Sequence, residues 1–133
     1  MSLEGGCRCG AVRYRVEGDA EHSAICHCAD CRKSSGTPVT VWSAFPTERF
    51  AITAGEAKAW QGTGAAIRHF CGGCGTGLWY INEEVLPGLV DIQTATLDDP
   101  EALPPQAHIQ AAEELTWMKS AHDLPHFDRY PGA

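Results

Sequence analysis

The chain is organised around the stretch Cys26-His27-Cys28-Ala29-Asp30-Cys31, which places three thiols within six residues. In an extended backbone alternate side chains share a face, so Cys26 and Cys28 point to one side and His27 to the other. A turn through Ala29-Asp30 would then return Cys31 to the side of the other two thiols. We therefore expect three sulfur atoms to meet at one point.

The remaining cysteines form two pairs with the spacing of metal knuckles, Cys7-Arg8-Cys9 and Cys71-Gly72-Gly73-Cys74. The seven thiols thus divide into four plus three. A closed Cys₄ zinc site is usually structural, whereas a site with three protein ligands keeps one position for water or substrate. Each pair supplies only two ligands and needs a partner, so we assign the open site to Cys26, Cys28 and Cys31. The odd number also argues against a complete disulfide framework.

Composition limits the classes of protein to consider. A chain of 133 residues is expected to form one domain, spanning 1–133, with a single hydrophobic core. Residues 1–70 carry a net charge of +1 and residues 71–133 a net charge of −8, which argues against a nucleic-acid partner. The first residues lack the features of a signal peptide, and no stretch approaches the ~18 apolar residues of a membrane span. We expect a soluble, cytoplasmic protein with no membrane partner.

Short alternating segments bounded by glycine and proline predict an all-β domain. Strands are expected at 12–17, 23–25, 39–45, 50–53, 57–61, 66–70, 77–81, 89–97 and 107–110. The segments 66–70 and 77–81 enclose the second cysteine pair, so they predict a zinc-ribbon-like hairpin. One helical turn is expected at 29–35, stopped by Gly36, a modest helix at 113–122, and an irregular tail at 124–133.

The ordered combination of cysteine motifs resembles the glutathione-dependent formaldehyde-activating enzyme family, which also contains centromere-protein-V-like members. The resemblance covers nearly the whole chain and is carried by Gly6-Cys7-Arg8-Cys9-Gly10, Cys26-His27-Cys28-Ala29-Asp30-Cys31-Arg32-Lys33, Phe70-Cys71-Gly72-Gly73-Cys74-Gly75-Thr76, Thr96-Leu97-Asp98, Pro104 with His108-Ile109, and Trp117.

The resemblance implies a β-tent fold with two zinc ions per chain. The structural zinc would be bound by Cys7, Cys9, Cys71 and Cys74, and the catalytic zinc by Cys26, Cys28 and Cys31. The implied activity is that of an S-(hydroxymethyl)glutathione synthase, a carbon–sulfur lyase that acts on glutathione and formaldehyde.

The chemistry of an open three-thiolate site agrees with this implied activity. Three thiolates on Zn²⁺ leave one net negative charge, so the open position favours another soft ligand such as a thiol. A thiolate held there suits addition to a small aldehyde, or the reverse cleavage of a carbon–sulfur bond. Arg32 and Lys33 follow the cluster directly and are expected to bind the carboxylates of a glutathione-like substrate.

Three alternatives remain open at the level of sequence. A histidine could complete the three-cysteine site and close it; the candidates are His22, His69, His108, His122 and His126. Cys28 and Cys31 could form a redox pair, although the expected βαβ context is missing. The protein could also be a non-catalytic zinc module that binds a thiol or a protein partner. The sequence assigns no general base and leaves the oligomeric state, a homodimer included, open.

Overall fold

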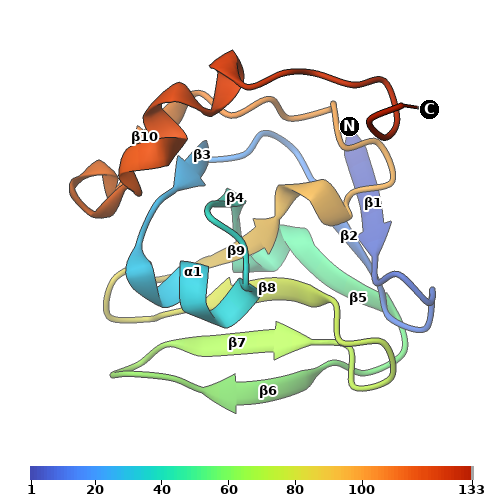
Figure 1. The fold of residues 1–133 in the computed structure, drawn as a ribbon. Coiled ribbons are helices and arrows are strands. Elements are labelled where there is room, and N and C mark those ends of the chain that lie inside the picture. The colour runs from blue at the N-terminus through green and yellow to red at the C-terminus, as the bar shows by residue number, and fades with distance from the viewer. Residues whose placement is uncertain (133) are drawn as a thin grey trace.

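A computed structural model describes residues 1–132, which form two β-sheets, one α-helix and several short 3-10 helices (Figure 1). The smaller sheet has the strand order β1-β2-β5, and the larger has the order β10-β3-β4-β9-β8-β7-β6. The strands are β1 Ser2–Gly6, β2 Arg13–Glu17, β3 His22–Cys26, β4 Thr40–Pro46, β5 Phe50–Ala54, β6 Lys58–Gln61, β7 Ile67–Phe70, β8 Gly77–Ile81, β9 Leu89–Gln93 and β10 Ala107–Ile109. The all-β class predicted from the alternating segments is confirmed.

Helices occupy three of the connections between strands and the segment that follows the last strand. The α-helix α1 spans Ala29–Ser35 and ends at Gly36, whose φ of 73° lies in the left-handed region that glycine tolerates. This agrees with the helical turn predicted there. The 3-10 helices are η1 Thr47–Arg49, η2 Thr94–Thr96, η3 Ala111–Glu113 and η4 Thr116–Asp123.

The hydrophobic core lies between the two sheets. Tyr14 and Val16 of β2 point into it, as the alternation along that strand predicts, and are almost completely buried. Trp79 of β8 meets them from the larger sheet, with ring centroids 6.1 Å from Tyr14 and 4.9 Å from Phe50. These aromatic contacts fix one face of β8 against the smaller sheet.

The opposite face of the larger sheet carries a row of side chains in direct cross-strand register. The row runs through Trp60 of β6, Arg68 of β7, Tyr80 of β8, Asp91 of β9, Ala44 of β4 and His22 of β3. Alternation places Cys26 and Trp42 on the same face. Cys31 of α1 packs against these two residues, so the helix lies on this face of the sheet.

The predicted strand at 89–97 is too long. Strand β9 ends at Gln93, because the Thr96 hydroxyl donates a hydrogen bond of 2.7 Å back to the Gln93 carbonyl oxygen and the chain turns into η2. Thr94 is buried there and its hydroxyl bonds to that of Ser43 at 2.7 Å. Short hydroxyl bonds of this kind compete with the sheet ladder.

The helix predicted at 113–122 does not form as one continuous helix. The segment forms η3 and η4 instead, separated by extended backbone at Glu114 and Leu115, and η4 is itself interrupted at Ser120. Trp117 is 57% exposed, and none of the residues of η4 is buried. An isolated short α-helix is marginal in water without a buried apolar face, so tighter local turns replace it.

Within residues 1–132, every helix is too short or too polar to span a bilayer.

Candidate metal centres

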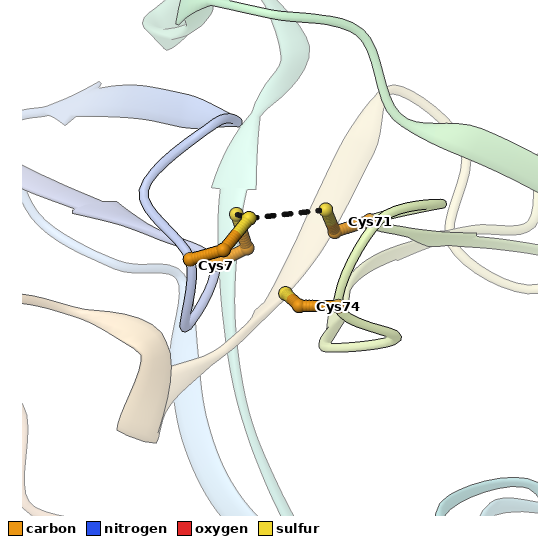
Figure 2. Close-up of side chains that lie close together, drawn as sticks. Cys7, Cys71 and Cys74 are labelled. Atoms are coloured by element: carbon orange, nitrogen blue, oxygen red, sulfur yellow. Dashed lines mark hydrogen bonds between the residues drawn. The ribbon is translucent and has the colours of Figure 1, made fainter.

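Four of the cysteines meet between two turns that are distant in sequence. Cys7 and Cys9 lie on the turn between β1 and β2, and Cys71 and Cys74 on the turn between β7 and β8. Their sulfur atoms all lie within 4.8 Å of one another. Figure 2 shows Cys7, Cys71 and Cys74 pointing toward a common centre. The group therefore joins the two sheets.

The backbone of both turns is arranged around the sulfur atoms. The amide of Val12 donates to Cys7 Sγ at 3.2 Å, and this hydrogen bond is the main cause of a lowered Cys7 pKa. In the second turn the Thr76 hydroxyl lies 3.2 Å from Cys74 Sγ and, with the Thr76 amide, holds the pKa of Cys74 at about 5. Both effects favour the thiolate, which is the form that binds metal.

The sulfur spacing fits zinc. Tetrahedral Zn–S bonds of ~2.3 Å put neighbouring sulfur atoms ~3.8 Å apart. The distance from Cys7 Sγ to Cys9 Sγ is 3.6 Å, and that from Cys9 Sγ to Cys71 Sγ is 3.8 Å. These four side chains could hold a metal ion in a closed site.

The other three cysteines meet at the junction of β3 and α1. Cys26 is the last residue of β3, Cys28 caps the N-terminus of α1, and Cys31 lies in its first turn. The amide of Cys31 donates to Cys28 Sγ at 3.2 Å, which bends the chain back as the turn at Ala29-Asp30 predicts. The three sulfur atoms lie within 4.8 Å of one another and form the second group that could hold a metal ion.

No histidine nitrogen or carboxylate oxygen of residues 1–132 joins this three-thiol group. His27 points away from it, as alternation predicts, and its Nε2 lies 2.8 Å from Nδ1 of His108 on β10. His69 stacks on Trp79, with ring centroids 5.3 Å apart. The alternative in which a histidine closes the site therefore has no support in the geometry.

The walls of the three-thiol group come from the larger sheet. Trp42 and Tyr80 pack against the cysteines, with their ring centroids 5.8 Å apart. Arg68 of β7 reaches the same point, and its Nη2 lies 3.5 Å from Cys31 Sγ. Hydrogen bonding with Cys26 and the neighbouring Arg68 lower the pKa of the Cys31 thiol to about 5.

Asp91 is a buried carboxylate on the same face. Its side chain is 9% exposed, and His22 Nε2 lies 3.4 Å from its Oδ1. Burial raises the pKa of Asp91 to about 6. The sequence itself marks Asp91 as unusual. It lies inside the apolar run Leu89-Val90-Asp91-Ile92, and an aspartate is rare in a buried strand.

Arg32 and Lys33 line a surface cavity of about 620 Å³, together with Leu115 and Trp117. The cavity also reaches Ala29, the neighbour of Cys28. Arg32 Nη1 donates to the His27 carbonyl oxygen at 3.1 Å and to a second backbone carbonyl at 3.0 Å, whereas the Lys33 side chain is exposed. Arg32 and Lys33 therefore share one cavity, whose lining includes none of the three cysteines, and part of the Arg32 guanidinium is already used for structure.

The sequence did not identify Arg68, Tyr80 or Asp91 as parts of this site. Arg68 precedes Cys71 by three positions in the sequence, yet its guanidinium contacts the other cysteine group. Cross-strand register, which spacing along the chain does not show, brings these residues together.

Comparison with known proteins agrees with this geometry. The family model described as glutathione-dependent formaldehyde-activating enzyme matches residues 2–113, which include all seven cysteines. A curated relative from Halomonas elongata, whose name provisionally assigns it to the same enzyme, is 29% identical over 133 residues, covering 90% of this chain and 81% of the relative.

The crystal structure of a Rhodobacter sphaeroides protein shares the fold, with a TM-score of 0.64 at 23% identity, covering 80% of this chain and 99% of that chain. The resemblance inferred from the cysteine motifs is confirmed by the extent of the family match. The chain belongs to the glutathione-dependent formaldehyde-activating enzyme family.

Proposed function

We propose that this protein is a zinc-dependent carbon–sulfur lyase that joins or cleaves a thiol and a small aldehyde, with glutathione and formaldehyde as its substrates. One observation carries the proposal: Cys26, Cys28 and Cys31 converge with no fourth side-chain ligand from residues 1–132. Such a donor set leaves one coordination position for an outside ligand. The family name supports the choice of thiol and aldehyde.

The proposed roles of the two cysteine groups differ. The four-thiol group of Cys7, Cys9, Cys71 and Cys74 binds a structural zinc, and the three-thiol group binds the catalytic one. A zinc ion held by three thiolates supplies a position that favours a soft ligand and lowers the pKa of an added thiol. In the addition, the sulfur–carbon bond forms as the carbonyl π bond breaks, and the thiol proton ends on the aldehyde oxygen. The reverse reaction cleaves the same carbon–sulfur bond.

In this proposal the protein orients the substrates and shields one side of the three-thiol group from water. Trp42 is almost completely buried and Tyr80 half-buried, so together they exclude water from the sheet side of the cysteines. Cys28 is the least buried of the three thiols, which supports an entry for ligands on its side. The cavity with Arg32 and Lys33 is also lined by Ala29, the sequence neighbour of Cys28, and its two cationic side chains suit the carboxylates of a glutathione-like thiol.

The central experiment measures the exchange between formaldehyde, glutathione and their adduct by NMR, with and without protein. We expect the wild-type protein to accelerate exchange and Cys28→Ser to abolish the acceleration while remaining folded. Ser34→Ala, on the exposed part of the same helix, is the matched control. Turnover at the wild-type rate by Cys28→Ser would refute the proposal. Thiol binding without acceleration by the wild type would favour the non-catalytic zinc module instead.

A second experiment tests the anionic end of the substrate. Lys33→Gln should raise KM for glutathione about two- to fivefold, as expected for one exposed charge contact. It should leave KM for 2-mercaptoethanol, which has no carboxylate, unchanged. Lys119→Gln removes the same charge from an exposed position outside the cavity and serves as the control. An equal rise in KM for both thiols would exclude Lys33 as a carboxylate-binding residue.

A further inference from the structure

Arg68 occupies an unusual position for a charged residue. It lies on β7 opposite Tyr80 of β8, and its guanidinium carbon is 5.0 Å from the centre of the Tyr80 ring. Only 14% of its side chain is exposed. Arginine buried to this extent is normally paired on all sides, because removing a charge from water is costly.

The contacts of Arg68 all lead toward the three-thiol group. Its Nη2 lies 2.8 Å from Oδ2 of Asp30 and 3.5 Å from Sγ of Cys31. Its Nε–H is buried and has no partner among residues 1–132. Asp30 is 57% exposed, so solvent screens its attraction. Of the two partners of the guanidinium, Cys31 Sγ is therefore the one whose interaction is less screened by solvent.

The net charge of a metal-loaded three-thiol group explains why a cation beside it is favourable. Three thiolates around a divalent ion leave one net negative charge, and an added thiolate makes two. In a partly buried site, with Trp42 and Tyr80 as walls, the second charge is poorly screened. The other nearby cation, Arg32, already donates from Nη1 to two backbone carbonyl oxygens. Arg68 is the guanidinium within hydrogen-bonding distance of the cluster.

We propose that Arg68 is a positioning residue that compensates the negative charge added when an external thiolate binds the three-cysteine site, and so sets the preference of this site for thiolate over neutral ligands. This rests on the proposed function, because it requires an open fourth position. A hydrogen bond to a charged acceptor typically changes an equilibrium about ten- to hundredfold, which sets the size of the expected effect.

The test uses the full chain loaded with cobalt, whose absorption reports a new ligand at the metal. Dissociation constants are measured for 2-mercaptoethanol, which binds as a thiolate, and for imidazole, which binds without charge. For Arg68→Gln we expect thiol binding to weaken about ten- to hundredfold at fixed pH while imidazole binding is unchanged. Arg68→Lys should recover part of the loss, because it restores the charge but not the planar fork.

Two controls keep the result interpretable. Arg15→Gln removes the same charge from an exposed pair on β2 and should leave both constants unchanged. Arg68→Met keeps an unbranched chain against Tyr80 and replaces Arg68→Gln if that variant does not fold. Equal weakening of thiol and imidazole, or no change in either, would overturn the role of Arg68. Absence of thiol binding to the wild-type protein would instead overturn the proposed function.

Discussion

The two cysteine groups should differ in what they contribute to folding, and serine substitutions make the difference measurable. Cys74→Ser removes a ligand from the group that joins the β1–β2 turn to the β7–β8 turn. Cys28→Ser removes a ligand from the group within the short segment 26–31. Both variants lose one thiol and differ in the length of chain that the metal closes, so each serves as the control for the other.

The expected loss of stability follows from the length of chain between the linked cysteines. Treated as a cross-link, the joint between the two turns, measured from Cys9 to Cys71, spans 62 positions and corresponds to about 4 kcal/mol of lost chain entropy in the unfolded state. The whole of this contribution is lost when Cys74→Ser releases the ion. The contact between Cys28 and Cys31 spans 3 positions and corresponds to about 2 kcal/mol. Domains of this kind have total stabilities of about 5–15 kcal/mol, so loss of the longer link removes a large part of the whole.

The assay is urea unfolding followed by circular dichroism, in the presence of zinc and a reductant without thiols. With a slope of about 2 kcal/mol per molar urea, we expect the midpoint to fall about 2 M for Cys74→Ser and about 1 M for Cys28→Ser. Zinc content measured by mass spectrometry should show which ion each variant has lost. Equal shifts, or a larger shift for Cys28→Ser, would refute the division into a structural and an open site.

Two further outcomes follow from single residues. Asp91→Asn should be more stable than wild type at pH 7, because the pKa of this carboxyl is raised from 3.8 to about 6 in the folded protein, which costs up to about 3 kcal/mol when it is ionised. The extra stability of Asp91→Asn should shrink as pH falls through about 6 toward 3.8, because the wild-type carboxyl is then protonated. Urea unfolding at several pH values measures this difference. If the variant is less stable than wild type at pH 7, the burial argument is contradicted. Gly55→Ala should destabilise far more than Gly36→Ala: φ is positive at both, but the added Cβ meets the Ala11 carbonyl oxygen at 2.1 Å at Gly55 and nothing within 4 Å at Gly36. Gly36→Ala should cost about 1 kcal/mol, and equal melting temperatures for the two variants would show that the loop at Gly55 yields to the new side chain.

The features visible in the sequence are those set by short-range spacing. The three-thiol group could be predicted because its members lie within six residues, and the grouping of the other four followed from counting the remaining thiols. Strands with clear alternation, such as β2, were predicted within a residue or two of their observed ends. For the three-thiol group and for strand β2, the direction of each side chain follows from the repeat of the backbone.

Strand β1 was missed because its sequence lacks the usual strand residues. It contains Gly5 and Gly6 and only one large apolar residue, Leu3. Yet Gly5 is buried, and a Cβ there would lie 2.5 Å from the Tyr14 hydroxyl and 2.6 Å from the Thr96 carbonyl oxygen. Glycine is present because two other segments approach closely, a tertiary requirement that local propensity does not show.

The two cysteine groups are connected through the β7–β8 hairpin. The turn of the hairpin carries Cys71 and Cys74, while its strands carry Arg68 and Tyr80, which face the three-thiol group. Strand β7 has four residues and pairs on one side with β8 and on the other with β6, an edge strand whose side chains are exposed. A metal ion held by the four cysteines would anchor the hairpin to the β1–β2 turn. We therefore expect the position of the Arg68 guanidinium against Cys31 to respond to a metal ion bound by the other set of thiols.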